Sequence, residues 1–174
     1  MINIESIGEG VWHVKQCFPD IMWERILAYA LTLPDDYYTH RFEPNRIRLD
    51  TSDYPTDPIF QELQTWAVDS IDHISSITGH RKQSLRQFPA VLLWRDFVGY
   101  RSGFHPDDYT NAPTLQIYLD GGILEGTSFI IDKRERTLPF LPNSGYLMDN
   151  QYQPCHGMIN SVGNHVRQSI YIVY

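Results

Sequence analysis

The chain has 174 residues and a formal net charge of −7, with 14 Lys and Arg against 21 Asp and Glu. Hydrophobic residues make up 42% and charged residues 20%, which excludes wholesale disorder and predicts a single globular domain with a sizeable core. The acidic balance argues against a general nucleic-acid binder, because such a protein has to neutralise phosphates. No stretch approaches the roughly 18 consecutive apolar residues of a membrane span.

The compartment is indicated by the N-terminus and by the cysteines. Residues 1–5 carry neither the basic nor the apolar region of a signal peptide. The two cysteines, Cys17 and Cys155, are too few for a disulfide framework. We therefore expect an intracellular, cytoplasmic protein with no membrane partner.

The first half of the chain predicts two helices. Apolar residues recur at helical spacing over 21–33, until a proline ends the pattern. A second apolar stripe covers 59–77, between Asp57, which is followed by proline as in a helix start, and Gly79 as the C-terminal cap. Before the first helix, alternation over 11–14 predicts an opening strand or hairpin.

The segment 34–57 between these helices is polar and aromatic and has no clear periodicity. A loop of this length is uncommon in a compact domain and is often a lid or a binding segment. The alternative is a surface excursion with a short edge strand. If the segment binds a ligand, the expected contact residues are Tyr37, Tyr38, Arg46 and Arg48.

From residue 87 onward the hydrophobic period changes to two, which predicts strands. Helices followed by a run of short strands favour a mainly β (α+β) fold, a double-sheeted barrel with two N-terminal helices packed on one sheet. We expect one domain over 1–174, with a helical support over about 1–86 and a barrel core over about 87–174. The predicted strands lie around 87–95, 98–105, 114–120, 127–132, 145–149, 156–160 and 166–173.

A possible metal site begins at His105 and Asp107, which share one face of an extended segment. A second histidine would complete a two-His-one-carboxylate triad, the ligand set typical of non-haem Fe(II). His156 is favoured as the third ligand because it opens a predicted strand, whereas His165 would crowd the face of an arginine two residues later. Asp108 points away from Asp107 and is expected to cap a turn.

That arginine is Arg167, in the apolar C-terminal strand. Arg167, Ser169 and Tyr171 lie on one strand face. Burying a guanidinium in so apolar a strand is costly unless it is paired. We therefore expect an anionic ligand, with a carboxylate clamped by the arginine and the serine hydroxyl.

These motifs resemble the 2-oxoglutarate- and Fe(II)-dependent oxygenases, particularly the prolyl-4-hydroxylase-like branch. The resemblance covers about the C-terminal half of the chain, and its parts come in the order of the family. They are Tyr100 with Gly103, the His105-x-Asp107 pair, the strand 115–119, Glu125 to Phe129, Pro142 to Leu147, His156, and Arg167-x-Ser169.

The resemblance implies a jelly-roll or cupin-like double-stranded β-helix. It implies Fe(II) held by His105, Asp107 and His156, and 2-oxoglutarate as the cosubstrate, consumed together with O2. The distal carboxylate of 2-oxoglutarate would bind Arg167, with Ser169 beside it.

Further cosubstrate contacts are also implied by the resemblance. Tyr100 resembles the tyrosine that assists the distal carboxylate in the prolyl-hydroxylase branch, and Tyr118 or Gln116 are the alternatives. The sequence departs from the family pattern at Glu125 and Gly126, whose order is shifted relative to the family's glycine–glycine–glutamate–threonine turn.

The implied reaction is oxidative decarboxylation of 2-oxoglutarate coupled to hydroxylation of a C–H bond. The branch suggests a protein or peptide side chain such as proline as the substrate. A free amino acid or other small metabolite is the second choice, and a nucleobase the third. Two other classes remain open, namely a zinc enzyme that uses the same ligands and a metal-binding barrel without catalysis.

Overall fold

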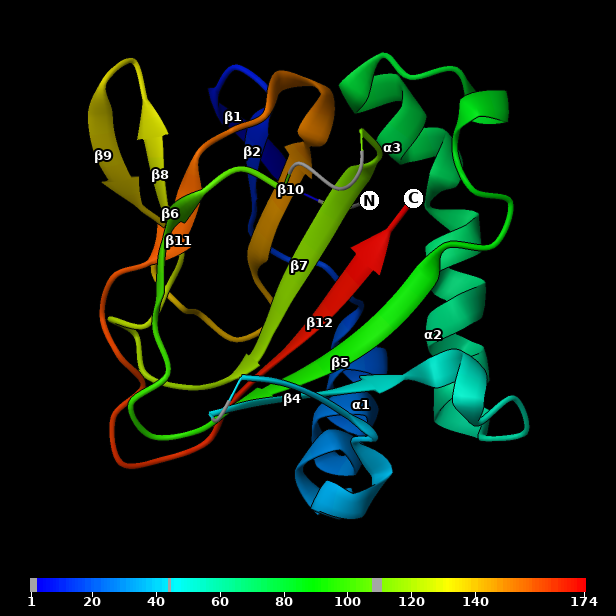
Figure 1. Cartoon of the computed structure of the whole chain (residues 1–174). Helices are drawn as coiled ribbons and strands as arrows, with labels where there is room; N and C mark the ends of the chain where they lie inside the picture. Colours follow the sequence, from blue (N-terminus) through cyan, green and yellow to red (C-terminus); the bar gives the residue numbers. More distant parts are fainter. Residues whose placement is uncertain (1–2, 44, 108–110) are drawn as a thin grey trace.

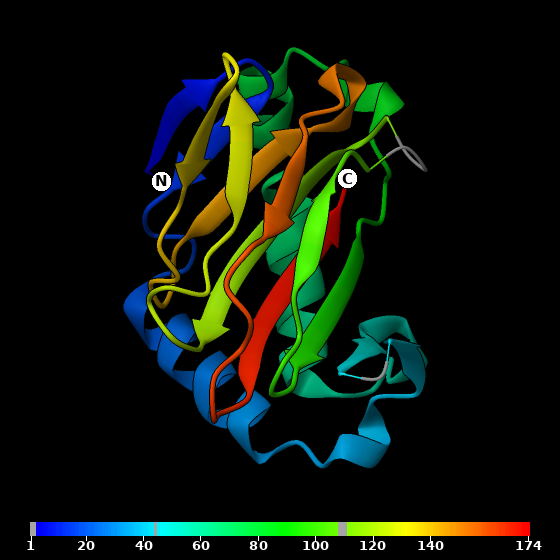
Figure 2. The same cartoon turned by 60° about the vertical axis from the view of Figure 1, so that its left-hand side comes forward.

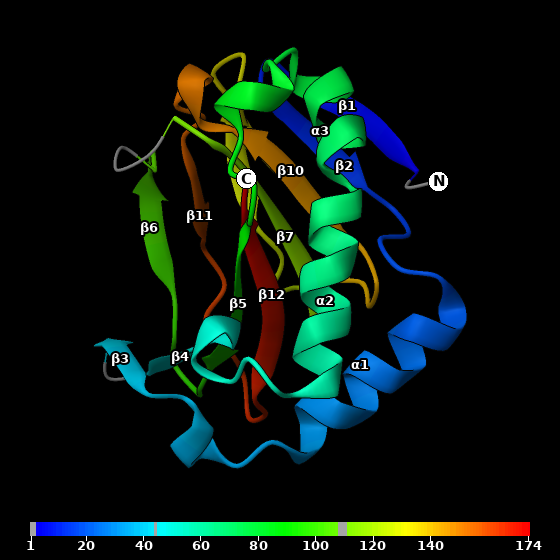
Figure 3. The same ribbon diagram turned by 90° about the vertical axis from the view of Figure 1, so that its right-hand side faces the viewer.

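Three layers make up the fold: a small antiparallel sheet, a large antiparallel sheet, and helices on the outer face of the large sheet (Figure 1, Figure 3). The computed structural model describes residues 3–43, 45–107 and 111–174. Figure 2 shows the small sheet lying across the large one on the side opposite to the helices. The arrangement is the double-sheeted barrel predicted from the change of hydrophobic period.

The large sheet has eight strands in the order β1-β2-β10-β7-β12-β5-β4-β3. The strands are β1 (Ile4–Gly8), β2 (Val11–Val14), β3 (His40–Glu43), β4 (Arg46–Asp50), β5 (Ala90–Asp96), β7 (Pro113–Asp120), β10 (Gly145–Asp149) and β12 (Arg167–Val173). The small sheet has four strands in the order β6-β11-β8-β9. These are β6 (Ser102–His105), β8 (Ser128–Ile131), β9 (Arg134–Thr137) and β11 (His156–Met158).

The helices are α1 (Asp20–Thr32), α2 (Pro58–Asp69) and α3 (Ile71–Thr78), with 3-10 turns η1 (Asp35–Tyr37), η2 (Thr51–Asp53), η3 (Lys82–Ser84) and η4 (Asn150–Tyr152). They cover the apolar face of the large sheet, where Leu49, Leu93 and Ile172 are buried with Phe60 and Leu63 of α2. Each fully buried side chain of this size contributes about 1.5–3 kcal/mol to stability. The opposite face of the same strands is therefore left for polar side chains.

The predicted ends of the second helical segment are confirmed, but its continuity is not. The Asp57 side chain accepts hydrogen bonds from the backbone N–H groups of residues 59 and 60 at 2.9 and 3.1 Å. Gly79 ends the segment in the left-handed conformation, with φ 75°. Between them Ser70 separates α2 from α3, and its hydroxyl is 2.7 Å from the hydroxyl of Tyr174. The N-terminal half thus supplies three α-helices among the described residues rather than two.

Segment 34–57 forms part of the large sheet, so the edge-strand alternative is the one that the structure shows. β4 pairs with β5 from Arg46↔Asp96 to Asp50↔Leu92, and β3 pairs with β4 at the edge. β9 is a strand that the sequence analysis missed, because all four of its residues are exposed and polar and show no alternation. The expectation for Asp108 lies outside the described residues.

Gly145 marks a close approach of two neighbouring strands, β10 and β7. A Cβ at this position would lie 1.8 Å from the carbonyl oxygen of Gln116, which is backbone and cannot move aside. Only glycine lets the two strands keep this separation.

Two further expectations concern disulfides and membranes. Cys17 and Cys155 are both free thiols. Among the helices of the described segments, none has the length and apolar character needed to cross a membrane.

Candidate metal centre and adjoining cavity

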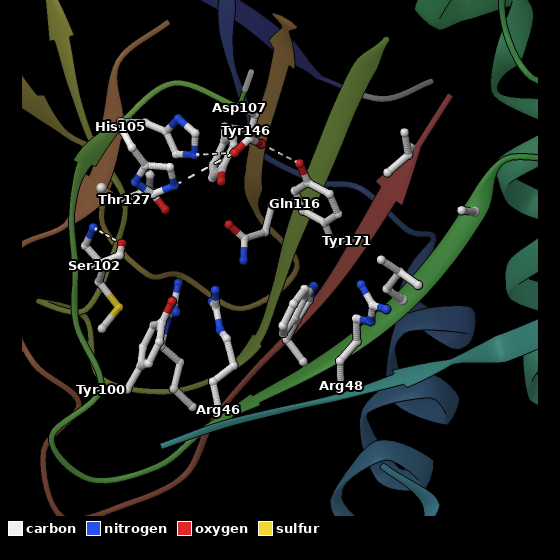
Figure 4. A pocket seen from close by; sticks show the side chains of 18 of the residues that line it. Arg46, Arg48, Tyr100, Ser102, His105, Asp107, Gln116, Thr127, Tyr146 and Tyr171 are labelled. Carbon is white, nitrogen blue, oxygen red and sulfur yellow. Dashed lines mark hydrogen bonds and ion pairs between the residues drawn. The ribbon is translucent and has the colours of Figure 1, made fainter. Parts of the chain in front are cut away.

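Three predicted ligands meet at one end of the small sheet. His105 ends β6, His156 begins β11, and the two residues are paired across these strands. Asp107 follows two positions after His105, and its Oδ1 lies 3.8 Å from the Nε2 atom of each histidine. The three ligand atoms all lie within 4.8 Å of one another. Figure 4 shows His105 and Asp107 directed toward the same point.

Each of these side chains is oriented by a second contact. His105 Nδ1 lies 2.7 Å from the carbonyl oxygen of Gly103, and His156 Nδ1 lies 3.2 Å from that of Pro154. Because a carbonyl only accepts, both rings carry the proton on Nδ1 and present the Nε2 lone pair. Tyr171 donates to Asp107 Oδ2 at 2.7 Å, which leaves Oδ1 for a further interaction.

Burial supports the same protonation state at His156. This residue is 7% exposed, and burial lowers the pKa of its imidazole, against the opposing effect of the Asp107 charge. The neutral ring is the form that binds a metal. Two imidazole nitrogens and one carboxylate oxygen with an open side fit non-haem Fe(II).

A cavity of about 860 Å³ lies next to these ligands, between the two sheets. Its wall includes His105, Asp107 and His156 at one end, and Arg167 and Tyr100 of the predicted cosubstrate residues. The other lining residues are Arg46, Arg48, Asp50, Arg86, Ala90, Leu92, Trp94, Ser102, Pro106, Gln116, Thr127, Tyr146, Gly157, Met158, Tyr171 and Val173.

Arg167 is 2% exposed and is held by a buried carboxylate. Its Nη1 donates to Asp96, which is 1% exposed, and Asp96 also accepts from Arg46 Nε at 2.6 Å and Nη2 at 3.3 Å. Among the described residues, the Arg167 Nε has no hydrogen-bond partner. Two guanidinium groups thus share one carboxylate, and the group keeps one net positive charge beside the cavity.

Aromatic rings surround these arginines. The Arg46 guanidinium lies 4.4 Å from the ring centre of Trp94 and 4.1 Å from that of Tyr100. The Arg167 guanidinium lies 4.9 Å from the ring centre of Phe140. Such stacking holds a guanidinium in a fixed plane, which suits recognition of a planar carboxylate.

Of the remaining predicted cosubstrate residues, Gln116 lines the cavity, whereas Ser169 and Tyr118 do not. Ser169 accepts a hydrogen bond from Gln116 at 2.9 Å. Tyr118 is fully buried, and its hydroxyl bonds the side chain of Thr127 at 3.0 Å. A contact from Ser169 or Tyr118 to a cosubstrate stays a prediction.

His165, the alternative third ligand, lies elsewhere. Its Nε2 is 2.8 Å from Glu125, which also accepts from the backbone N–H groups of Gly122 and Gly163. Burial acts to raise the pKa of the Glu125 carboxyl, but the two backbone donors and His165 outweigh it, so this pKa is lowered. Glu125, whose place in the sequence departs from the family's turn pattern, therefore has a structural role. It connects the loop that contains Gly122 with the loop that contains Gly163.

Of the four contact residues predicted in segment 34–57, two reach the cavity. Arg46 and Arg48 line it, whereas Tyr37 stacks on Tyr54 with ring centres 5.0 Å apart. Tyr38 is buried under the Arg95 guanidinium, which lies 4.4 Å from its ring centre.

Sequence reasoning missed Asp96, Thr127 and Tyr146 as site residues. Tyr146 lines the cavity, and burial raises the pKa of its phenol, so that its hydroxyl stays a donor. No local pattern pointed to Asp96, because its pairing with Arg167 depends on the register of β5 and β12.

Comparison with known proteins shows which fold this chain shares. Neither a known protein family nor a characterised protein matches the sequence, but many solved structures match the fold. A Pseudomonas putida prolyl-4-hydroxylase has a TM-score of 0.73 at 11% identity, covering 94% of this chain and 91% of its own. An oxidoreductase of the 2OG-Fe(II) oxygenase family from Burkholderia pseudomallei has a TM-score of 0.69 at 14% identity, covering 95% and 84%.

The chain has the double-stranded β-helix fold of the 2-oxoglutarate- and Fe(II)-dependent oxygenases. This confirms the fold expected from the resemblance. A third structure with this oxygenase fold is the epimerase SnoN in complex with Fe3+, alpha-ketoglutarate and nogalamycin RO. It has a TM-score of 0.71 at 12% identity and covers 94% of this chain and 78% of its own.

Proposed function

We propose that the protein is a 2-oxoglutarate- and Fe(II)-dependent hydroxylase. The observation that carries the proposal is the convergence of His105, Asp107 and His156 at one end of a cavity that has Arg167 in its wall. The oxygenase fold supports it. When bound, Fe(II) with 2-oxoglutarate and O2 would supply the oxidising chemistry that yields succinate, CO2 and a hydroxylated C–H position.

The protein's own residues would bind, orient and exclude water. The two histidines and Asp107 would hold the metal, because their second contacts fix the two rings and engage Asp107 Oδ2 with the Tyr171 hydroxyl. Arg167 binds the distal carboxylate of 2-oxoglutarate with the positive charge that Asp96 leaves uncompensated, since Arg46 shares the same carboxylate.

For the substrate we propose first a protein or peptide side chain such as proline, as in the prolyl-hydroxylase branch. The second candidate is a small metabolite. Its support is the cavity of about 860 Å³, which is large enough to enclose a small molecule beside 2-oxoglutarate, and the small molecule bound by SnoN, which shares the fold.

The test is an anaerobic titration of the metal-free protein with Fe(II) and then 2-oxoglutarate, monitored by visible absorption. A metal-to-ligand charge-transfer band that needs both additions is the expected result. His156→Ala should abolish the band. The matched control His165→Ala should keep it, because that histidine contacts Glu125 and not the metal residues.

A folded protein that binds Fe(II) but gives no band with 2-oxoglutarate would favour the zinc-type alternative. If the protein binds no iron, the remaining alternative is a barrel without catalysis. If the band is observed, peptides that contain proline and free small molecules are then compared as substrates. The readouts are succinate release and a gain of one oxygen atom in the mass of the product.

A further inference from the structure

The inner face of the large sheet carries its polar side chains in rows that strand register sets. The first row is Arg46, Asp96 and Arg167, which are paired across β4, β5 and β12. The charged groups of this row pair with one another, since both arginines donate hydrogen bonds to Asp96. Its remaining positive charge is the one assigned above to the cosubstrate.

The next rows lie further along the same strands and contain a second arginine of β4. Arg48 is opposite Trp94, and its guanidinium lies 5.5 Å from the centre of that ring. Asp50 is opposite Leu92, which is opposite Tyr171. Figure 4 shows Arg46 and Arg48 rising from one strand toward the cavity, so Arg48 lies outside the Asp96 cluster but inside the same pocket.

An apolar floor connects this region to the metal residues. Leu92, Tyr171 and Val173 pack on one another, with Ala90 beside them, and all four line the cavity. The floor begins at the predicted metal ligands, because the Tyr171 hydroxyl donates to Asp107 Oδ2. Along β12 it continues beyond Tyr171, on the side away from Arg167.

The charged groups around this floor are predominantly positive. Arg86, in the segment between η3 and β5, is exposed and lines the cavity, and within the described residues it makes no hydrogen bond or ion pair. Apart from Asp107, one of the predicted metal ligands, the one acid among the lining residues is Asp50, whose Oδ1 accepts from Ser52 N at 3.0 Å and Ser52 Oγ at 2.8 Å. The chain as a whole carries a net charge of −7, so a positive cavity sets this site apart from the rest of the protein.

We propose that Arg48 and Arg86 form an anion-binding subsite for the primary substrate, which therefore carries a carboxylate on a compact apolar body. This proposal rests on the proposed function and adds the substrate class. The apolar body lies on the floor of Leu92, Tyr171 and Val173, with its reacting C–H bond at the Asp107 end. The anionic group lies at the arginines, whose charged donors give the interaction its strength.

The first experiment uses sulfate as the probe and the protein loaded with Zn(II) and 2-oxoglutarate, so that the metal and Arg167 are already engaged. Sulfate replaces chloride at constant ionic strength. The 15N indole signal of Trp94, assigned by its loss in Trp94→Phe, reports binding because this ring lies beside Arg48. The indole signals of Trp12, Trp23 and Trp66 serve as internal references.

Sulfate should shift the Trp94 signal saturably. Each lost charged hydrogen bond weakens binding by about tenfold or more, so Arg48→Gln and Arg86→Gln should each raise the half-saturating concentration by about that factor. Arg48→Lys should raise it less, because it keeps the charge. Arg81→Gln is the matched control, since Arg81 is also exposed but does not line the cavity.

The proposed subsite is refuted if sulfate does not shift the Trp94 signal. It is also refuted if sulfate shifts this signal equally in the Arg48→Gln/Arg86→Gln double variant. Failure of the proposed function gives a different result, because 2-oxoglutarate itself would then not bind. In that case the same titration of the metal-free protein still decides whether Arg48 and Arg86 bind an anion.

Competition then separates the two sources of a carboxylate. N-acetylproline is compared with its amide, and a proline peptide flanked by glutamates with its glutamine counterpart, each as a competitor of bound sulfate. Displacement by N-acetylproline but not by its amide identifies a small free acid, and displacement by the glutamate peptide alone identifies an acidic peptide. If neither acid displaces sulfate more strongly than its neutral counterpart, the assignment of an acidic substrate is wrong.

Discussion

Asp96→Asn should strongly destabilise the protein, because one buried carboxylate is the shared partner of two arginines. Asp96 is 1% exposed and accepts one hydrogen bond from Arg167 and two from Arg46. The amide removes the negative charge and leaves two guanidinium groups facing each other with little access to water. Breaking a buried ion pair from one side costs about 3–5 kcal/mol. For a chain of this length, that lowers the unfolding midpoint by about 6–20 °C.

The assay is thermal and denaturant unfolding of the metal-free protein. The control is Asp72→Asn, which removes an exposed ion pair with Lys82 of 2.6 Å and should cost less than about 1 kcal/mol. Adding 2-oxoglutarate with Zn(II) returns negative charge to the arginines, so it should raise the midpoint of Asp96→Asn by more than that of the unsubstituted protein. If Asp96→Asn unfolds within about 1 kcal/mol of the unsubstituted protein, the pairing of Asp96 does not hold this region together.

Three further predictions test other contacts. Tyr171→Phe removes the hydrogen bond to the predicted carboxylate ligand and should weaken Fe(II) binding about 10- to 100-fold with the fold intact, as measured by competition with a chelator. Gly145→Ala should destabilise the protein by about 3 kcal/mol or more in denaturant unfolding, because its Cβ meets the Gln116 carbonyl. The lowered pKa of Glu125 contributes stability above its unfolded pKa that is lost as pH falls through the folded value, so Glu125→Gln should flatten the acid limb of the stability curve, whereas His165→Gln should flatten it less.

The helix signals could be predicted from sequence because they are local. A capping side chain and a left-handed glycine act within one turn, and both Asp57 and Gly79 are found in those roles. The break at Ser70 could not be predicted in the same way. Its hydroxyl contacts Tyr174 at the other end of the chain, and no local pattern reports that contact.

The candidate site shows the same division between local and distant information. His105 and Asp107 are two residues apart, so alternation alone puts them on one face, and pairing of β6 with β11 then brings in His156. Arg167 was expected to be paired, but its protein partner was not foreseen. Asp96 faces it only through the register of β5 and β12, which the sequence of either strand leaves undefined.

The predicted metal ligands His105 and His156 come from the small sheet, whereas Arg46 and Arg48 come from β4 of the large sheet. If the proposed function holds, the residues for the reaction and those for substrate choice can therefore be altered separately. On β4 the residues alternate, with Arg48 and Asp50 facing the cavity while Ile47 and Leu49 are buried in the core. Variation at positions 48 and 50 can therefore alter which molecule is accepted without disturbing the core or the ligands on the other sheet. A library confined to these two positions therefore tests the proposed substrate subsite while the predicted metal ligands stay unchanged.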